Sequence, residues 1–360
     1  MNRIGKYLIW LLFPLGLIHL FVLWVRNKLY DANLIKSRRL PAPVISVGNI
    51  QLGGSGKTPL VIKLAEQLQQ QGLKVGVLTR GYKRSTTGDV IVDLRDVAAE
   101  QINYLDVGDE PAIIAKHLKD GAIGIGANRY EVGLNLLQKN PVDILLLDDG
   151  FQHRRLQRDV DICLINVSQW RTHPFLFPFS YLRDLKSSLK RADLIVLTKI
   201  GTNTVLAENL KNELKRSCNS PVITANFSVR GLGKVSGERI YKLQQMAGRK
   251  AGAFCGIATP ADFFATLREQ GLEVVFGKSF PDHYEYKLRD VIELGQRASE
   301  SCVDILITTE KDAVKLQPLI EARKDKLPDV YFLQVSLNVE NEDEFSVFVR
   351  RKILEAIGRQ

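Results

Sequence analysis

Residues 44–58 read VISVGNIQLGGSGKT: a short apolar run, a glycine-rich turn and a lysine–threonine pair. The next residues, from Pro59 to Gln71, have the spacing of an amphipathic helix. A glycine-rich turn between a strand and a helix is the setting of a Walker A phosphate-binding loop. In such a loop, backbone N–H groups and the positive end of the helix face phosphate oxygens. The stretch therefore predicts an α/β fold built around a nucleotide site.

Each polar residue of this loop has an expected task. Lys57 neutralises charge on the β- and γ-phosphates and thus takes part in catalysis, and the Thr58 hydroxyl ligates Mg²⁺. Gln51 stands where the full Walker A pattern has its first glycine, so neighbouring glycines must supply the flexibility. The predicted nucleotide-binding residues are Gly53, Gly54, Ser55, Gly56, Lys57 and Thr58.

A second motif follows a later apolar run. Residues 142–147 (VDILLL) precede Asp148, Asp149 and Gly150. At the carboxyl end of a parallel strand, the two carboxylates would face the same crevice as the glycine-rich loop. A carboxylate there holds Mg²⁺ directly or through water. Asp-Gly is also common in turns, but two adjacent aspartates together with GSGKT favour a metal site at Asp148 and Asp149.

Apolar runs alternate with helical patterns along the 360 residues, which predicts a P-loop NTPase-like parallel sheet with helices on both faces. A second α/β run after residue 250 predicts another, smaller lobe. Residues 221–235 alternate and contain two glycines, as in a hairpin or a linker. The expected parts are an N-terminal apolar helix with a basic segment (1–40), a P-loop domain (41–220), a linker or hairpin (221–250), and a second lobe with a closing C-terminal helix (251–360).

Composition narrows the possible classes of protein. Apolar residues make up 45% and charged residues 25%, which excludes disordered, collagenous and coiled-coil chains. The net charge of +10 favours anionic partners, although it also suits simple solubility. Nucleic acid is not expected, because no interleaved basic and aromatic platform is present. Four cysteines far apart in sequence fit a reducing compartment.

The N-terminus carries a long apolar segment. Residues 7–25 contain no acidic or basic side chain and would span roughly 28 Å as a helix, close to the thickness of a bilayer core. Basic residues are more numerous after the segment than before it, which predicts a cytoplasmic body. The bulky residues 23–25 disfavour a signal-peptide cleavage site, and a buried core helix would be an unusual start. A full crossing competes with a helix bent at Pro14 in the inner leaflet; either holds the chain at a membrane.

Several motifs together resemble one known family. They are GNIQLGGSGKTP (48–59), TRGYKR (79–84), VGDEP (107–111), LLLDDGFQHRRLQRD (145–159), FPDHYEY (280–286) and TTEKDAVK (308–315). In this order, over nearly the whole chain, they resemble the tetraacyldisaccharide 4′-kinases, the lipid A 4′-kinases of Gram-negative bacteria. The resemblance implies transfer of the γ-phosphate of ATP to the 4′-hydroxyl of a tetraacylated disaccharide 1-phosphate, with Mg²⁺, to form lipid IVA.

The resemblance also implies catalytic roles. It places the family's catalytic aspartate at Asp109 and, across the cleft, a supporting histidine at His283. From the residues alone, Asp106 and Glu110 compete with Asp109 as the base that takes the hydroxyl proton, and Asp109 could instead cap a helix. His153 is expected to pack beside Asp149.

Two further groups of residues follow predicted strands. Arg80 and Arg129 could clamp the transferred phosphoryl group or the substrate's 1-phosphate, or form surface salt bridges. Thr309–Asp312 and Leu197–Lys199 are weakly similar to base-recognition loops, and Lys311-Asp312 could equally be the first turn of a helix.

The expected partners are the acylated disaccharide lipid and the surface of the bacterial inner membrane, with the catalytic body on its cytoplasmic side and the chain a monomer. The alternative function is a membrane-associated P-loop NTPase that acts as a switch or motor.

Overall fold

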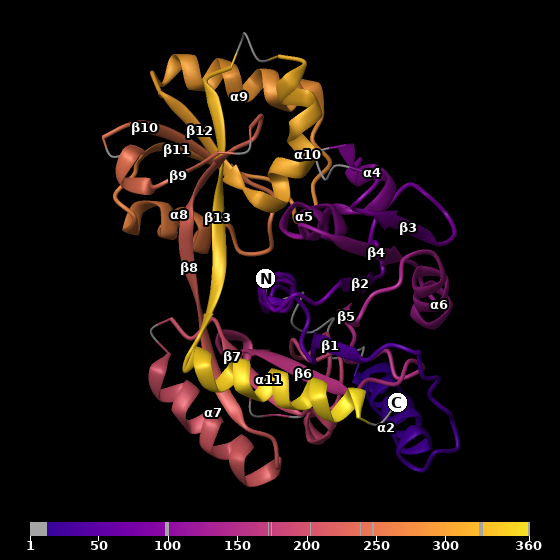
Figure 1. Ribbon diagram of the computed structural model, residues 1–360. Coiled ribbons are helices and arrows are strands. Elements are labelled where there is room, and N and C mark those ends of the chain that lie inside the picture. Colours follow the sequence, from indigo (N-terminus) through magenta and orange to yellow (C-terminus); the bar gives the residue numbers. More distant parts are fainter. Residues whose placement is uncertain are drawn as a thin grey trace.

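The structure, a computed structural model, describes residues 13–97, 101–171, 173, 175–201, 203–237, 239–246, 248–323 and 327–358 (Figure 1). The strands are β1 (Val44–Asn49), β2 (Val75–Thr79), β3 (Val90–Asp93), β4 (Gly121–Ile125), β5 (Ile144–Asp148), β6 (Val160–Asn166), β7 (Leu194–Thr198), β8 (Val222–Lys234), β9 (Ile240–Tyr241), β10 (Lys250–Cys255), β11 (Glu273–Ser279), β12 (Ile305–Thr309) and β13 (Asp329–Val339). The helices are α2 (Phe13–Asp31), α3 (Lys57–Gln70), α4 (Tyr104–Val107), α5 (Asp109–His117), α6 (Arg129–Lys139), α7 (Thr204–Ser217), α8 (Pro260–Glu269), α9 (Leu288–Glu300), α10 (Glu310–Glu321) and α11 (Glu342–Ile357).

The described strands form one sheet in the order β11-β10-β12-β13-β8-β7-β6-β1-β5-β2-β4-β3, and β9 pairs with β8. From β7 to β4 all pairs are parallel, and β3 closes that edge antiparallel. From β11 to β13 the pairs are parallel again. The expected P-loop-like parallel sheet and the second α/β lobe are therefore both present.

Alternation along the strands explains why helices cover both faces of the first lobe. Ile144 and Leu146 of β5 pack with α3 and α5, whereas Leu145 and Leu147 pack with α6 on the opposite face. All five residues of β5 are buried, as in a parallel strand covered on both sides.

One long strand joins the two lobes. β8 pairs parallel with β7 at residues 222–224 and antiparallel with β13 at residues 225–234. Residues 221–235, expected as a hairpin or linker, thus form mainly a single strand shared by both lobes. Figure 1 shows β8 and β13 running side by side from one lobe to the other.

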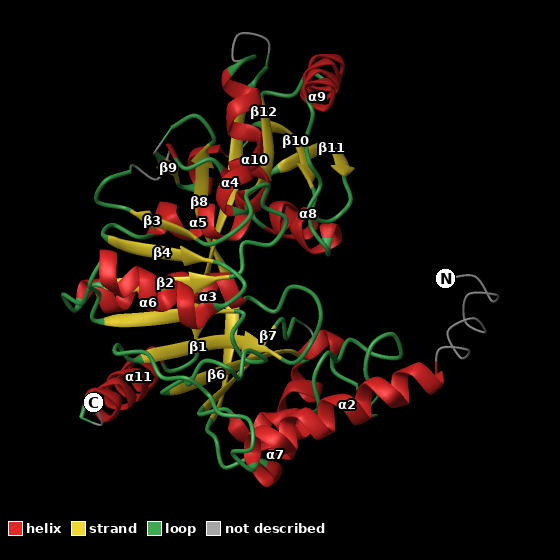
Figure 2. Cartoon of the chain, turned by 90° about the vertical axis from the view of Figure 1, so that its right-hand side faces the viewer, coloured by secondary structure: helices red, strands yellow, loops and turns green. Residues whose placement is uncertain are grey.

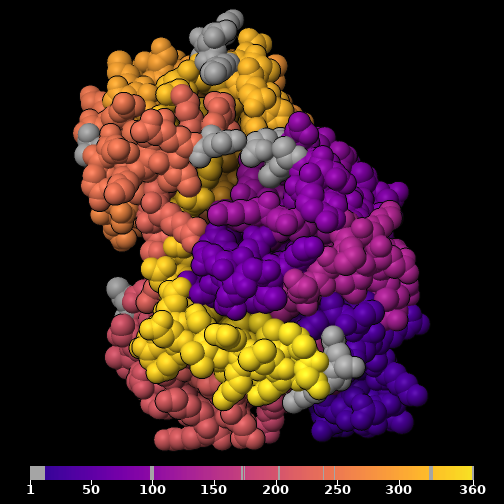
Figure 3. All heavy atoms as spheres, viewed as in Figure 1, coloured from indigo at the N-terminus to yellow at the C-terminus, as the bar shows by residue number. Residues whose placement is uncertain are grey.

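The C-terminal helix lies elsewhere than the sequence suggested. Phe345, Val349 and Ile353 of α11 belong to the same apolar core as the P-loop strand β1. α11, assigned from sequence to the second lobe, therefore packs on the first, because β13 carries the chain back before the helix begins. In Figure 3 this helix, in yellow, crosses the lower front of the molecule.

The structure describes the N-terminal helix from Phe13 onward. In the part of the chain that the structure describes, no helix is long and apolar enough to cross a membrane. Residues 7–12 of the apolar segment lie outside that part, and Pro14 lies in the first turn of α2. The helix continues to Asp31, and its polar end is docked: Asn27 is buried and donates hydrogen bonds to Asp184 and Ser188 at 3.2 and 3.1 Å.

Candidate active site

The glycine-rich loop is held by contacts from two strand ends. Asn49 donates a 2.8 Å hydrogen bond to the Ser55 hydroxyl, and the Thr198 hydroxyl donates to the Ser55 carbonyl at 2.8 Å. Gly56 has φ +91°, and a Cβ there would lie 2.8 Å from the Phe227 ring, so only glycine fits. Helix α3 begins at Lys57. The N–H groups of its first turn have no partner within the helix and therefore point toward the loop. The predicted loop residues 53–58 thus form a glycine-rich turn at the start of α3, and phosphate binding there stays a prediction.

Gln51, the departure from the Walker A pattern, has a structural task. Its side chain accepts a 2.7 Å hydrogen bond from the Asn166 N–H and donates a 3.0 Å bond to the Asn166 carbonyl. Gln51 is buried and so ties the loop to the end of β6. A glycine could not make this contact.

The two aspartates after β5 occupy different environments. Asp148 is buried, and its Oδ1 has no hydrogen-bond partner among the described residues. Burial, together with the charges of Glu110 and Asp149, raises the pKa of Asp148 to about 7. Asp149 has φ +52° and lies 3.6 Å from the Lys57 ammonium. Burial alone would raise the pKa of Asp149, but the charge of Lys57 and the contact with Arg183 hold it well below its usual range.

Arg183 belongs to this site but was not predicted. Its guanidinium contacts both carboxylate oxygens of Asp149 and also the Asn49 side chain. Arg183 lies between β6 and β7 in a segment without a recognisable motif. The sequence therefore offers no reason to place Arg183 at the site. The next residue, Asp184, accepts a hydrogen bond from Asn27, so this segment also connects Asp149 to α2.

The carboxylates leave room for a cation but do not form a complete protein cage. Among the described residues, no group of three or more His, Cys, Asp or Glu side chains is placed to hold a metal ion. The unpartnered Oδ1 of Asp148 and the raised pKa of that carboxyl fit a divalent cation nearby. Mg²⁺ keeps several waters and takes phosphate oxygens as ligands, so one or two carboxylates and the Thr58 hydroxyl suffice.

Asp109 begins α5 at a tight junction between two loops. Gly108 has φ +99°, and a Cβ there would meet the backbone of residues 81 and 82 at 3.2–3.3 Å. This packing sets TRGY (79–82) against GDEP (108–111) and buries Asp109. The neighbouring Glu110 donates its N–H to Asp109 Oδ1 at 3.1 Å, and its charge acts on Asp148. Glu110 is therefore close enough to Asp148 for its charge to act there.

The second lobe supplies the partners of Asp109. His283 Nδ1 lies 3.0 Å from Asp109 Oδ2, so the predicted pair is formed across the lobes. His283 has φ +57°, a conformation that costs free energy in a non-glycine residue and is common at functional sites. The rings of Phe280, Tyr284 and Tyr286 pack against one another beside it, with centroids 4.8–5.3 Å apart. This aromatic cluster fixes the loop that presents the imidazole.

Two lysines of α10 complete the surroundings of Asp109. Lys315 Nζ lies 3.3 Å and Lys311 Nζ 3.9 Å from Asp109 Oδ2. Burial would raise the pKa of Asp109, but the hydrogen bond to His283 and the charges of both lysines hold it well below its usual range. Of the three competing acids, Asp106 is exposed and Glu110 is half-buried, whereas Asp109 is buried among cations.

The TTEKDAVK motif is therefore a helix start. The Thr309 hydroxyl accepts from the Asp312 N–H at 3.1 Å, as an N-cap does, and donates to the Asp312 carboxylate at 2.6 Å. Asp312 also accepts from the Gly256 N–H at 2.9 Å. Capping of α10 explains Thr309 and Asp312 without the role in base recognition that the sequence weakly indicated.

Of the two strand-end arginines, Arg129 lies near Asp148 and Asp149, and Arg80 lies near Arg129. Arg129 is buried and donates to the Ala127 carbonyl at 2.9 Å. Burial and the charge of Arg80 lower the pKa of Arg129, while Asp149 and Asp148 oppose this. Arg80 itself is exposed. For His153, burial and four surrounding arginines lower the pKa to about 4, so arginines rather than Asp149 dominate its surroundings.

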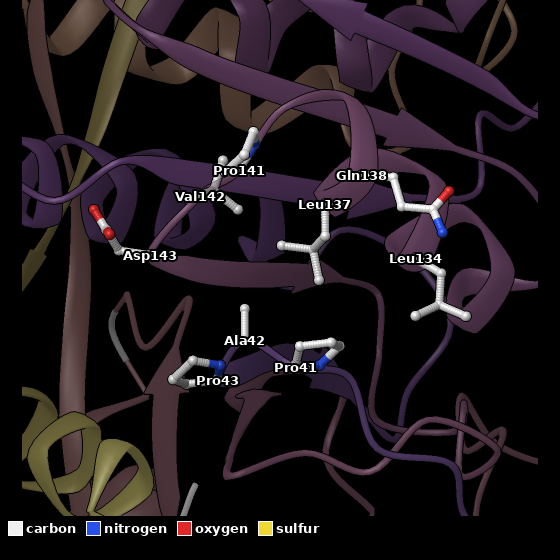
Figure 4. Close-up of a pocket in the computed structure, with 9 residues that line it drawn as sticks. All are labelled: Pro41, Ala42, Pro43, Leu134, Leu137, Gln138, Pro141, Val142 and Asp143. Atoms are coloured by element: carbon white, nitrogen blue, oxygen red, sulfur yellow. The ribbon is translucent and has the colours of Figure 1, made fainter.

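A pocket of about 440 Å³ lies elsewhere (Figure 4). It is lined by the residues just before β1 and β5 and by α6, including Pro43, Leu137 and Asp143. The amino ends of β1 and β5 are opposite to the carboxyl ends that carry the loop and Asp148. The pocket is therefore not part of the site.

Comparison with known proteins agrees with this geometry. Residues 8–354 match the family described as "Tetraacyldisaccharide-1-P 4'-kinase". Proteins named "Tetraacyldisaccharide 4'-kinase" from Syntrophus aciditrophicus and Pelobacter propionicus are each 35% identical, covering 90% and 89% of this chain and 88% and 87% of theirs. The crystal structure of "apo" form LpxK from Aquifex aeolicus in complex with ATP has a TM-score of 0.75 at 30% identity, covering 95% of this chain and 98% of that one. The chain belongs to the tetraacyldisaccharide-1-phosphate 4′-kinase family.

Proposed function

We propose that this chain transfers the γ-phosphate of ATP to the 4′-hydroxyl of a tetraacyldisaccharide 1-phosphate, with Asp109 as the base. The product is lipid IVA, an intermediate of lipid A biosynthesis. The observation that carries the proposal is the pair formed by buried Asp109 and half-buried His283, 3.0 Å apart, next in sequence to Glu110, whose charge acts on Asp148 at the end of β5. A switch or motor is disfavoured because the family is one of kinases.

The loop and its neighbours bind and orient ATP. Backbone N–H groups of residues 53–58 and the start of α3 face the phosphates, and Lys57 neutralises their charge. Thr58, Asp148 and Asp149 would hold Mg²⁺, which when bound supplies positive charge to the phosphate oxygens. Because Lys57 pairs with Asp149 here, ATP must draw its ammonium toward the phosphates.

Asp109 accepts the proton of the acceptor hydroxyl as the new O–P bond forms and the bond to ADP breaks. Phosphoryl transfer passes through a loose transition state, so the hydroxyl needs orientation more than early deprotonation. A carboxylate that stays ionised at every physiological pH meets this need. The low pKa of Asp109 makes it a weak base, so we assign it orientation of the hydroxyl and acceptance of the proton late in the transfer.

Arg80 and Arg129 are proposed to bind phosphate oxygens. Both follow strands that end at the site, and Arg129 is buried near Asp148 and Asp149. The arginine charge stabilises either the transferred phosphoryl group or the 1-phosphate of the acceptor.

The apolar face of α2 supports attachment to the inner membrane with the body on its cytoplasmic side. One face of the helix packs on the protein through Leu20, Leu23 and Asn27. The other face is apolar and exposed over two turns, and α2 projects from the body (Figure 2). The exposed apolar residues of this face are Leu15, Leu17, Ile18, Phe21, Val22 and Trp24. Such a face suits an interfacial helix, which would bring the site to an acceptor whose acyl chains stay in the leaflet.

Turnover distinguishes the kinase from its alternative. Purified protein is incubated with radiolabelled ATP and either acylated disaccharide 1-phosphate or none, and the lipids are separated by thin-layer chromatography. A kinase labels the lipid and consumes ATP in step with it. ATP hydrolysis at the same rate with and without the acceptor would instead identify a switch or motor.

The expected monomer is tested by analytical sedimentation of the same preparation.

Membrane attachment is tested separately. Phe21→Asp and Ile18→Asp place charge on the exposed face of α2 without touching the packed face, and flotation with anionic phospholipid vesicles should fall for both. Val205→Asp, an exposed apolar residue of α7, is the matched control and should float like the wild type. Equal flotation of all variants would exclude this face as the attachment surface.

A further inference from the structure

Two lysines on one face of α10 surround the pair formed by Asp109 and His283, and neither has a task in the reaction described so far. Lys311 and Lys315 are four residues apart, so their side chains project from the same side of the helix. That side meets α5, which begins with Asp109. Lys315 is buried, and a buried lysine needs a charged or polar partner.

The contact that matters most joins Lys311 to the imidazole. Lys311 Nζ lies 3.0 Å from His283 Nε2, while His283 Nδ1 lies 3.0 Å from Asp109 Oδ2. An ammonium group has three donors and no acceptor, so Nε2 must accept. In a neutral imidazole the other nitrogen then carries the hydrogen, and Nδ1–H donates to Asp109.

The other protonation states conflict with these distances. If Nε2 carried the hydrogen, the lone pair of Nδ1 would face a carboxylate oxygen at 3.0 Å, and a hydrogen would face an ammonium. If both nitrogens carried hydrogens, an imidazolium would lie 3.0 Å from the Lys311 charge, where like charges repel strongly. Lys311 thus excludes both states.

We propose that Lys311 is a positioning residue that keeps His283 neutral with its hydrogen on Nδ1, and that Lys315 holds the ionised Asp109 in place beside it. This inference rests on the proposed role of Asp109 as base and goes beyond it. Neutral His283 orients Asp109 without competing for the proton, so the hydroxyl proton passes to the Asp109 carboxylate alone. The lysines act through Asp109 and His283 and do not touch the acceptor.

The lysines and His283 belong to the second lobe, while Asp109 belongs to the first. Asp282, 3.9 Å from Lys311, and the Tyr284 carbonyl, 3.4 Å from Lys315, hold the ammonium groups from the His283 loop. The second lobe therefore carries the whole set of cations as one unit.

The test reads the hydrogen position directly. Full-length protein labelled with ¹⁵N at histidine gives separate signals for protonated and unprotonated ring nitrogens, and His283 is identified among the five histidines by its loss in His283→Gln. In the wild type without acceptor, we expect Nδ1 protonated and Nε2 unprotonated. In Lys311→Met, where the like charge beside Nε2 is gone while the Asp109 carboxylate still faces Nδ1, we expect the imidazolium with hydrogens on both nitrogens to appear, with kcat lower by roughly tenfold to a hundredfold, as for removal of a group that orients another. The KM for ATP should change little.

Two variants serve as controls. Lys311→Arg keeps a cationic donor and should restore the Nδ1–H tautomer and part of kcat. Lys116→Met removes another lysine at the junction of α5 and α10, where Lys116 contacts Gln317 at 3.0 Å, and should alter neither the His283 signals nor kcat. Circular dichroism of each variant reports its folding, and if Lys311→Met does not fold, Lys311→Gln takes its place.

The outcomes separate this inference from the proposed function. If His283 in Lys311→Met keeps Nδ1 protonated and Nε2 unprotonated as in the wild type, the inference is overturned, whether or not kcat falls. Near-normal turnover in Asp109→Ala would instead overturn the proposed base, and the tautomer measurement, which needs no turnover, would still stand.

Discussion

His117 should make the stability of the protein depend on pH between about 6.5 and 9. At the end of α5, its Nδ1 lies 3.2 Å from Glu66 of α3 and its Nε2 lies 2.8 Å from Glu310 of α10. Arg230 of β8 pairs with Glu66 at 2.9 Å, so the cluster joins both lobes. Burial alone would lower the pKa of His117, but the hydrogen bonds and charges of Glu310 and Glu66 raise it to about 9.

The sign and the size follow from this pKa. Because the folded-state pKa lies above the unfolded value of 6.5, ionised His117 stabilises the folded protein fully below pH 6.5. This contribution is lost as the pH rises through about 9. Raising the pKa from 6.5 to about 9 corresponds to about 3 kcal/mol. For a chain of this length, that is a few degrees of melting temperature.

The assay compares the wild type with His117→Gln, which keeps a polar side chain but cannot ionise. Melting temperatures of both are measured at pH 6 and pH 9.5, and the difference between the two proteins cancels the titration of all other groups. The wild type should be more stable by a few degrees at pH 6, and the difference should shrink at pH 9.5. A difference that is the same at both pH values would refute the reasoning.

Three further predictions concern catalysis. Lys57→Ala should lower kcat by roughly a hundredfold or more in a folded protein, because the phosphate charge loses its counterion; near-normal turnover would contradict the role of the loop. Asp148→Ala and Asp149→Ala should each raise the Mg²⁺ concentration needed for half-maximal turnover, and an unchanged requirement in both would remove them from the metal site. Asp109→Ala should lower kcat far more than it changes the KM for ATP, and Asp109→Ala with His283→Ala should be little worse, since a supporting group then has nothing to support. Strict additivity of the two losses would show that His283 acts independently of Asp109.

Local patterns predicted the parts of the fold that depend on neighbours in sequence. The run VISV, the turn GGSGKT and the following helix lie within a few residues of the expected places, as do the strand and the two aspartates of VDILLLDD. Each of these combines a buried strand with a turn that only particular residues can form. All the residues that form such a strand and turn lie within about fifteen positions of one another in the sequence.

The parts that failed depend on distant partners. Residues 222–234 alternate as a strand should, but alternation does not reveal that one strand pairs with β7 at its start and with β13 afterwards. Lys311 and Lys315 have the spacing of a solvated helix face, and only the packing of α10 on α5 buries Lys315 beside Asp109. Arg183 lies in a stretch without a pattern, and its role follows from the fold alone.

The way the chain enters and leaves the second lobe has a consequence for how the base is assembled. Residues 235–328 are an insertion within the first lobe, entered through β8 and left through β13, and these two strands form an antiparallel ladder. A two-stranded ribbon twists more readily than a wide sheet. Rotation about this ribbon would carry His283, Lys311 and Lys315 away from Asp109 together. The same rotation would part α10 from α5 and Glu310 from His117, so these contacts together with the stiffness of the ribbon would set how often the enzyme is ready to react.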